Sequence, residues 1–396
     1  MIRLEQDGIG VREVPSYAYY GIQTLRAGEI FPIASTPVHK EFIVALACVK
    51  KAAAQAHLDM GTLPIRIGSL LVKAAEEVIQ GRHLEHFKVD FIQGSINDSL
   101  NMNMNEVLAN RVLELMLADK GDYALVNPSF HINLGQTTNE VISTALRIAS
   151  YQLSQKLTGT AEQLIAGLLA AAKQPSEPHH QSKEPQARPG TKEWLIGQFK
   201  EAALSLQQDM DELAKAASHL QTVRLSDTTA SGGTELSHGF SNKAVAYLSK
   251  LTQIPLTVSQ ADKESSQNTD VFVQFSSALK LCALTLTKLC RSVRMVAASS
   301  QADRGDWGQP PGVQTEKAEA LSQIAFQVIG FDHSIKLASE AGIIDRGAVQ
   351  PIVAYNLIES LIILSRGMES FVQPLTFEEK SDIPAHLRGW TEKCGL

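Results

Sequence analysis

Asn101-Met-Asn-Met-Asn105-Glu-Val-Leu-Ala-Asn110-Arg-Val-Leu-Glu114 is the stretch of the chain that decides the fold. Three alternating asparagines lead directly into a run whose apolar residues recur at helical spacing. Asparagine disfavours helices because its amide competes for backbone partners, so Asn101, Asn103 and Asn105 require an explanation. Buried amides that brace the start of a helix, or a polar site, provide one. A solvated first turn of the helix is the alternative.

The overall charge excludes two classes of partner. The chain has 396 residues, with 36 lysines and arginines against 42 aspartates and glutamates, for a net charge of −6. This balance provides no general attraction for nucleic acids or anionic membranes, and neither is expected as a partner. No apolar run is long enough to span a bilayer, and residues 1–7 lack the apolar core of a signal peptide.

The four cysteines do not have the spacing of a metal site; they are Cys48, Cys282, Cys290 and Cys394. Cys282 and Cys290 share one apolar helical stretch, where free buried thiols are expected. Unpaired thiols are typical of a reducing compartment, so we expect a cytoplasmic protein.

Helical periodicity dominates the sequence. Apolar residues recur every three or four positions in the segments 40–60, 66–80, 105–118, 138–172, 196–219, 270–298 and 316–369. Strand-like alternation is nearly absent, and Ile254-Pro-Leu-Thr-Val258 is the best short candidate. Long helices with few strands predict an all-α protein, a bundle of long helices. Residues 174–193 are rich in proline and polar side chains and predict a loop that buries too little to fold alone.

Several further segments share the motifs of one enzyme family. They are Arg12-Glu-Val-Pro15, Ala18-Tyr-Tyr-Gly21, Val89-Asp-Phe-Ile-Gln-Gly94 through Glu114, His131-Ile-Asn-Leu-Gly-Gln-Thr-Thr-Asn-Glu140, Gln267-Asn-Thr-Asp270, Ala325-Phe-Gln-Val-Ile-Gly330 and Ala354-Tyr-Asn356. Together they resemble the aspartase/fumarase superfamily, and its aspartate ammonia-lyase branch in particular. The resemblance covers about residues 3–370, with a poor match in the middle.

The resemblance implies an architecture and an assembly. Family members have a central bundle of long antiparallel helices paired across a homotetramer, with active sites assembled from three subunits. We therefore expect an N-terminal helical domain in residues 1–137 and a central helical bundle in 138–369, which contains the loop 174–193. Residues 370–396 are expected to be a short remnant of the family's C-terminal domain.

The family's reaction is anti elimination across a Cα–Cβ bond. The resemblance therefore implies that no metal and no organic cofactor is needed. Polar groups hold the substrate's carboxylates and stabilise an aci-carboxylate, while a base removes the neighbouring proton. The resemblance assigns substrate binding to Ser99 and Asn101 and to Thr137, Thr138 and Asn139. The last three residues are also suited to cap the helix that follows them, and both interpretations stay open.

Two other parts of the family's site are altered. Asp98 stands where the family has a carboxylate-binding threonine, and Leu100 where it has another hydroxyl. A desolvated carboxylate beside a substrate carboxylate is repulsive by several kcal/mol, which argues against ordinary aspartate binding. The family's Thr-His pair falls on Gln186-Ala187. His180, a few residues upstream, is a candidate base or a surface histidine of the loop.

The signature loop departs furthest from the family. In relatives it supplies a serine base, a lysine and an asparagine, but here it is shorter by roughly a dozen residues, as loops tolerate. Asp306 falls at the position of the serine, and Gly312 and Gln314 at those of the lysine and asparagine. Arg304 is a candidate for bidentate carboxylate binding, while Asp306 and Asp98 remain as candidate bases. A single charged residue in a loop is more often a solvated surface charge, which is the alternative for each of them.

Two interpretations from different classes follow. In the first, the chain is a divergent lyase that performs cofactor-free β-elimination on an amino-acid-like carboxylate, with Asp306, Asp98 or His180 as the base. In the second, it is a catalytically silent paralogue that acts as a scaffold or regulatory subunit, in a homotetramer or in a mixed tetramer with an aspartase-like chain. Ordinary aspartase and fumarase activities are expected to be absent in both.

Overall fold

The computed structural model describes residues 1–92, 96–173, 189, 191–225, 239–259, 270–303, 315–341 and 346–372. Long helices dominate it, so the prediction of an all-α protein is confirmed. The helices are α1 (Ile22–Ile30), α2 (Lys40–Asp59), α3 (Ile65–Ile79), α4 (Ile96–Leu115), α5 (Thr138–Ala171), α6 (Lys192–Ser218), α7 (Phe240–Thr252), α9 (Asp270–Asp303), α10 (Thr315–Ala341) and α11 (Arg346–Val372). The shorter elements are the 3₁₀ turns η1 (Leu84–His86) and η3 (His219–Gln221), the π turn η2 (Pro128–Ile132), and the strands β1 (Ile2–Asp7), β2 (Gly10–Pro15), β3 (Thr222–Val223) and β4 (Thr257–Val258).

The chain forms two compact units. Unit 1 consists of Met1–Gln155, Leu213–Ala278 and Gly330–Ile362; unit 2 consists of Lys156–Glu212, Leu279–Ile329 and Ile363–Leu396. Each of α5, α6, α9, α10 and α11 contributes residues to both units, so the units do not follow the order of the sequence. The expected domains 1–137, 138–369 and 370–396 remain a prediction.

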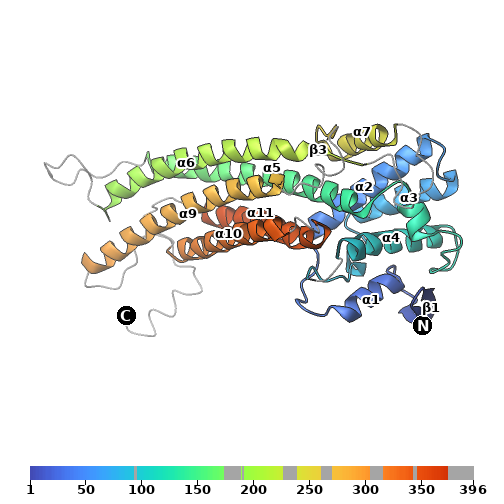
Figure 1. Cartoon of the computed structure of the whole chain (residues 1–396). Coiled ribbons are helices and arrows are strands. Elements are labelled where there is room, and N and C mark those ends of the chain that lie inside the picture. Colours follow the sequence, from blue (N-terminus) through green and yellow to red (C-terminus); the bar gives the residue numbers. More distant parts are fainter. Residues whose placement is uncertain are drawn as a thin grey trace, which may run out of the picture. The chain divides into compact units, whose positions relative to one another are not determined.

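Alanines allow the helices of unit 1 to pack closely. Ala45, Ala52 and Ala53 of α2 are fully buried, which lets α3 lie directly alongside. Figure 1 shows α2 and α3 side by side, with α4 next to α3. In unit 2 the segments of the long helices each bury a leucine stripe, for example Leu206 of α6 and Leu286 of α9.

α4 is buried on nearly every face, and its polar residues are hydrogen-bonded to several other segments. Asn103 donates to the His86 carbonyl (3.0 Å) and accepts from the Lys88 amide (3.0 Å). Asn110 donates to the Tyr19 carbonyl (2.8 Å) and accepts from the Gly121 amide (2.8 Å). All three asparagines of the motif are buried, so the solvated first turn is wrong. The bracing role is confirmed for Asn101 and Asn103, whereas Asn105 has no hydrogen-bond partner among the described residues.

Glu106 of α4 organises the start of α1. Its carboxylate accepts hydrogen bonds from the amides of Gly21 (2.8 Å) and Gln23 (2.9 Å) and from the hydroxyl of Thr24 (2.6 Å). These amides have no partner within the helix, so a side chain from another helix acts as their cap. A Cβ on Gly21 would lie 2.8 Å from Cδ of Glu106, which explains the glycine at this position.

Five sequence-based expectations need correction. α4 begins at Ile96 rather than near residue 105, and α1 and α7 were not expected. The segment 316–369 divides into α10 and α11, and α6 begins inside the predicted loop 174–193. The strand expected at 254–258 is reduced to β4, which pairs in parallel with β3.

The hairpin β1–β2 was also missed, because most of its apolar residues face solvent. Leu4 is exposed, while Glu5 and Val14 are buried. Its turn is held by the Asp7 carboxylate, which accepts from the amides of Ile9 (3.0 Å) and Gly10 (3.1 Å). The Asp-Gly pair at the start of this turn is the signal that predicts it.

Two smaller expectations concern membranes and thiols. Among the helices that the structure describes, none is both long and apolar enough to cross a bilayer. Cys282 and Cys290 are buried free thiols as predicted, and Cys48 is a third. Cys394 lies outside the described residues.

A buried ion pair joins α3 to α4. Arg111 donates to the Glu77 carboxylate from Nε (2.6 Å) and from Nη2 (2.9 Å). His83 Nε2 lies 3.0 Å from the same carboxylate. Arg111 thereby lowers the pKa of Glu77 from 4.5 to about 2. A carboxyl whose pKa is lowered on folding stabilises the fold above its unfolded pKa, and this contribution is lost as the pH falls through the folded pKa.

We predict that Glu77→Gln lowers the free energy of unfolding by about 3 kcal/mol at neutral pH, because a pKa shift of one unit corresponds to about 1.4 kcal/mol. The difference from wild type should shrink as the pH falls from 4.5 towards 2, which urea unfolding at several pH values measures. Glu76→Gln removes an adjacent, more exposed carboxylate and should cost no more than about 1 kcal/mol. If the loss of unfolding free energy in Glu77→Gln did not depend on pH, the lowered pKa of Glu77 would not be its cause.

Candidate functional site

The starts of α4 and α5 meet in unit 1. The Asn101 amide donates to Oγ1 of Thr138 (3.2 Å) and to Oδ1 of Asn133 (3.1 Å). The two segments that the sequence singles out, around Ser99 and around Asn139, therefore lie next to each other. Ser99, Thr138 and Asn139 are half-buried, so the segments are partly open to solvent.

Thr137 and Thr138 have different roles. The Thr137 hydroxyl accepts from the Glu140 amide (3.4 Å), as the side chain of an N-cap threonine does, and donates to the Glu140 carboxylate (2.9 Å). Glu140 in turn pairs with Arg224. The Thr138 hydroxyl instead faces Asn101. The helix-cap interpretation thus applies to Thr137, and Thr138 belongs to the polar contact between the helices.

Lys50 of α2 lies beneath this contact and was missed from the sequence. Its side chain is fully buried, and its only hydrogen bond among the described residues is to Oδ1 of Asn133 (2.7 Å). Burial without a carboxylate partner lowers the pKa of Lys50 well below 10.5. Its place in the helical period, four residues after the buried Leu46, is the signal that predicts an inward-facing lysine. We refer to Lys50, Asn101, Asn133 and Thr138 as the polar cluster.

The turn that carries Asn133 is stabilised by a hydrogen bond from α2 and by one within the turn. Asn133 donates to the Gln136 carbonyl (3.1 Å), and His57 Nε2 donates to the Leu134 carbonyl (2.8 Å). Gly135 has φ of +67°, a conformation that favours glycine. Burial lowers the pKa of His57, consistent with a neutral ring that donates from one nitrogen only. Asn133 is thus fixed before any ligand binds.

Some buried amide atoms near the polar cluster have no hydrogen-bond partner. Among the described residues these include Oδ1 of Asn101, Oε1 of Gln136 and both amide atoms of Asn105. A buried carbonyl oxygen without a donor costs free energy, so each such atom needs an explanation. An ammonium or amide N–H is the group that would satisfy these oxygens.

Of the other predicted site residues, only Asp98 lies among the residues that the structure describes. Asp98 lies in the first turn of α4 with its side chain exposed. His180, Arg304 and Asp306 lie outside the described residues, as do Gln186-Ala187. Their roles as base or carboxylate ligand stay predictions.

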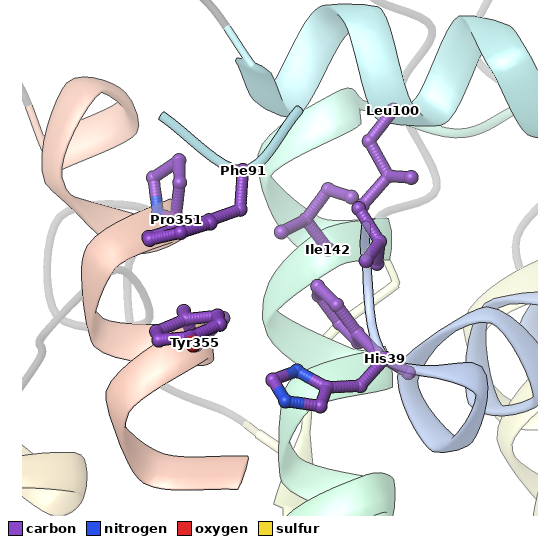
Figure 2. Close-up of a pocket in the computed structure, with 9 residues that line it drawn as sticks. His39, Phe91, Leu100, Ile142, Pro351 and Tyr355 are labelled. Atoms are coloured by element: carbon purple, nitrogen blue, oxygen red, sulfur yellow. The ribbon is translucent and has the colours of Figure 1, made fainter. Parts of the chain in front are cut away.

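A narrow apolar cavity lies beside the polar cluster in unit 1. Figure 2 shows Leu100, Ile142 and His39 on one side of it, with Pro351 and Tyr355 of α11 on the other. Its volume is about 20 Å³. Tyr355 also stacks on Phe91, with 3.8 Å between ring centroids and 10° between the ring planes. His39 Nε2 lies 2.7 Å from the Glu359 carboxylate, so this ring nitrogen is occupied.

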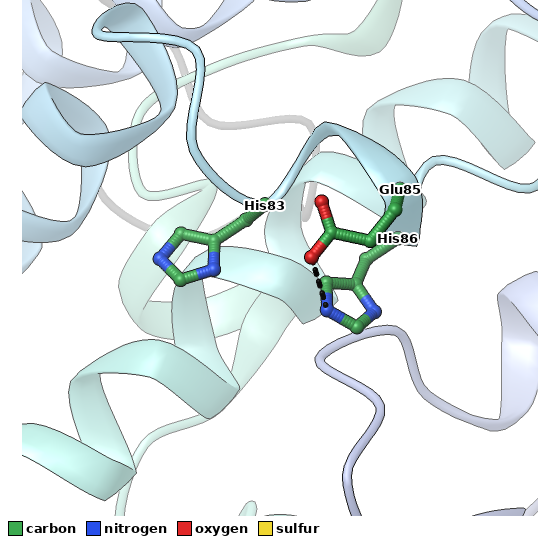
Figure 3. A group of neighbouring side chains, drawn as sticks. All are labelled: His83, Glu85 and His86. Atoms are coloured by element: carbon green, nitrogen blue, oxygen red, sulfur yellow. Dashed lines mark ion pairs between the residues drawn. The ribbon is translucent and has the colours of Figure 1, made fainter.

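A second group, His83, Glu85 and His86, has the donor types of a metal site (Figure 3). Its ligand atoms lie within 4.8 Å of one another, but they are already engaged. His86 Nδ1 accepts from the Tyr19 amide (3.4 Å), which leaves the proton on Nε2, 3.3 Å from Glu85. His83 Nε2 faces Glu77. These contacts favour hydrogen bonds within the protein over metal ligation.

The fold and the site define a class: a protein of long helices with a polar site where two helix starts meet. A family model described as lyase matches residues 10–305. The chain is 35% identical to the aspartate ammonia-lyase of Bacillus subtilis over 386 residues, which cover 93% of this chain and 80% of the relative. It is 31% identical to that of Escherichia coli K12, over 94% of this chain and 80% of the relative.

Solved structures agree with this match. A fumarate lyase:delta crystallin from Brucella melitensis, bound to cobalt, superimposes with a TM-score of 0.84 at 31% identity, covering 94% of this chain and 84% of that one. A class II fumarase from Schistosoma mansoni gives a TM-score of 0.82 at 21% identity, over the same shares of the two chains, and shows the same fold. The chain belongs to the aspartase/fumarase superfamily of lyases, on its aspartate ammonia-lyase side.

We predict that Lys50 makes the stability of the protein depend on alkaline pH. The unfolded chain holds a proton on Lys50 up to about 10.5, whereas the folded chain releases it at lower pH. The unfolded state therefore binds more protons, and stability rises with pH in that window by up to about 1.4 kcal/mol per pH unit. Urea unfolding should show that Lys50→Met removes this rise. Lys51→Met, which removes the neighbouring ammonium, is the control; equal slopes in wild type and Lys50→Met would refute the assignment.

Proposed function

We propose that the chain is a divergent lyase that eliminates ammonia from an amino-acid-like carboxylate without a cofactor. The observation that carries the proposal is the Asn101–Thr138 hydrogen bond, because it brings together the two polar segments that match the substrate-binding segments of the family. Membership of a lyase family supports the reaction class.

The helix starts suit the charges of such a reaction. α5 begins at Thr138, and the amides of a first helical turn favour a bound carboxylate and the aci-carboxylate that forms from it. Ser99, Asn101, Thr138 and Asn139 offer hydroxyl and amide groups around that position. The unsatisfied carbonyl of Asn101 is an acceptor for the ammonium group that leaves.

The proposal also needs a base and a group that binds the second polar end of the substrate. Asp306, Asp98 and His180 are the candidate bases, and Arg304 is the candidate second carboxylate ligand. The negative charge of Asp98, which replaces a hydroxyl group in the first turn of α4, repels a substrate carboxylate bound there. Ordinary aspartase and fumarase activities are therefore proposed to be absent.

The proposal includes assembly as a cytoplasmic homotetramer. Long helices in unit 2 carry large apolar side chains that face solvent, among them Leu204 of α6 and Phe326 of α10, at 67% and 59% exposure. Apolar surface of this kind is typical of helices that pack against another subunit. Assembly with an aspartase-like paralogue is the alternative, in which this chain is the silent subunit.

We predict that purified protein produces an enoate, detected by ultraviolet absorbance, from at least one member of a panel of aspartate, malate, argininosuccinate and other amino or thio acids. Asn139→Ala should lower kcat/KM by roughly 100-fold, as loss of a group that binds developing charge does, without changing the unfolding temperature. Asn242→Ala, an exposed asparagine of α7, is the matched control and should leave turnover unchanged.

A flat trace across the panel, from folded protein, would reject the lyase. Co-purification with an aspartase-like chain would then support the silent subunit. Turnover that Asn139→Ala leaves unchanged would instead reject the site while keeping the reaction.

A further inference from the structure

Two residues that line the apolar cavity are near neighbours, on the same helices, of residues of the polar cluster. Ile142 follows Thr138 by one turn of α5, so their side chains share a face with about 5–6 Å between Cβ atoms. Leu100 is the immediate neighbour of Asn101 on α4. Both helices therefore present a polar residue to the candidate site and an apolar residue to the cavity. A ligand held at Thr138 is therefore one helical turn from Ile142 in the cavity wall.

The cavity accepts an apolar group. Its polar lining residues are His39 and Tyr355, and the others are apolar: Val38, Phe42, Phe91, Leu100, Ile142, Pro351 and Ala354. The Nε2 atom of His39 is paired with Glu359, and the Tyr355 ring is stacked on Phe91. A charged or strongly polar group placed here would lose its hydration without gaining a matched partner. At about 20 Å³ the cavity exceeds the roughly 10–15 Å³ that one water needs, which suits a group of one or two carbons.

Asp98 selects for the charge on the rest of the ligand. It precedes Asn101 by three residues and so lies on the same face of α4, one turn nearer the helix start. Its exposed carboxylate attracts an ammonium group and repels a second carboxylate. A ligand for this site therefore combines one carboxylate, one ammonium group and a small apolar substituent.

We propose that the substrate is a β-amino acid, R–CH(NH₃⁺)–CH₂–COO⁻, in which R is a methyl or ethyl group that occupies this cavity. The inference rests on the proposed lyase function and names its substrate class. In the elimination, a base removes a proton from the carbon beside the carboxylate, and the C–H electron pair forms the new double bond. The C–N bond breaks, and its electron pair leaves with ammonia. The products are R–CH=CH–COO⁻ and, once the proton on the base is returned, ammonium.

Calorimetric binding to the full-length protein tests this substrate class, with four probes that differ only in R. They are 3-aminopropanoate, 3-aminobutanoate, 3-aminopentanoate and aspartate, in which R is hydrogen, methyl, ethyl and carboxylate. We expect the Kd to fall about fourfold for each added carbon, because that is the effect of burying one methylene group. Aspartate should bind most weakly. Enoate absorbance is followed with the same four compounds.

Two variants test the cavity itself. Ala354→Val adds two carbons to the cavity wall, and should abolish the preference for 3-aminopentanoate over 3-aminopropanoate while leaving the Kd of 3-aminopropanoate within twofold. Ala109→Val adds the same atoms to the buried side of α4 away from the cavity, and should keep the preference. Leu100→Ala enlarges the cavity and provides a second variant should Ala354→Val fail to fold; it should extend the preference to longer R groups.

The outcomes separate the substrate class from the reaction. Equal or tighter binding of aspartate, or a preference that Ala354→Val leaves intact, overturns the substrate class; enoate from aspartate would then keep the lyase. Tighter binding of 3-aminobutanoate without enoate from any probe supports the cavity assignment and overturns elimination from this substrate class. No binding of any of the four also overturns the substrate class. In either case, enoate from another member of the wider panel keeps the lyase, and a flat trace across that panel rejects it.

Discussion

The burial of α4 on nearly every face is the constraint on which the rest of unit 1 depends. A helix surrounded by protein has no solvated side, so a polar side chain on it that finds no partner within the fold costs free energy. Asn103 and Asn110 satisfy backbone groups of η1 and of the segments near Tyr19 and Gly121. Glu106 caps α1. One helix thereby fixes the positions of several segments that are far apart in the sequence.

The candidate site follows from the same constraint. Asn101 is buried like the other asparagines, but it reaches the start of α5 rather than a backbone group, and Lys50 supports the contact through Asn133. A fully buried lysine with an amide as its partner is costly, and so are amide oxygens without a donor. Departures from full pairing of this kind concentrate where a protein binds something, because the ligand completes the hydrogen bonds.

The protein has the helical fold of its family, and its candidate site differs from the pattern that the resemblance implies. Family membership is shown by the match over residues 10–305 and by relatives at 31–35% identity. The first turn of α4 differs, since Asp98 faces solvent where the resemblance places a hydroxyl and Leu100 lines an apolar cavity. In the proposed function, the converging helix starts bind a carboxylate and the neighbouring side chains set which substituents fit.

The sequence by itself determined the fold class, the long helices and the two polar segments, because helical periodicity and local motifs are written in neighbouring residues. It also placed the buried thiols and the buried asparagines. It did not predict α1, whose capping groups come from Glu106, or the role of Lys50, since both depend on residues distant in the chain. It left the choice between cap and ligand-binding group open at Thr137 and Thr138. Only the tertiary structure brings Asn101 to within a hydrogen bond of Thr138 and turns Thr137 back onto Glu140, because these contacts join residues that helical periodicity does not relate. Ligand binding by the two threonines stays a proposal.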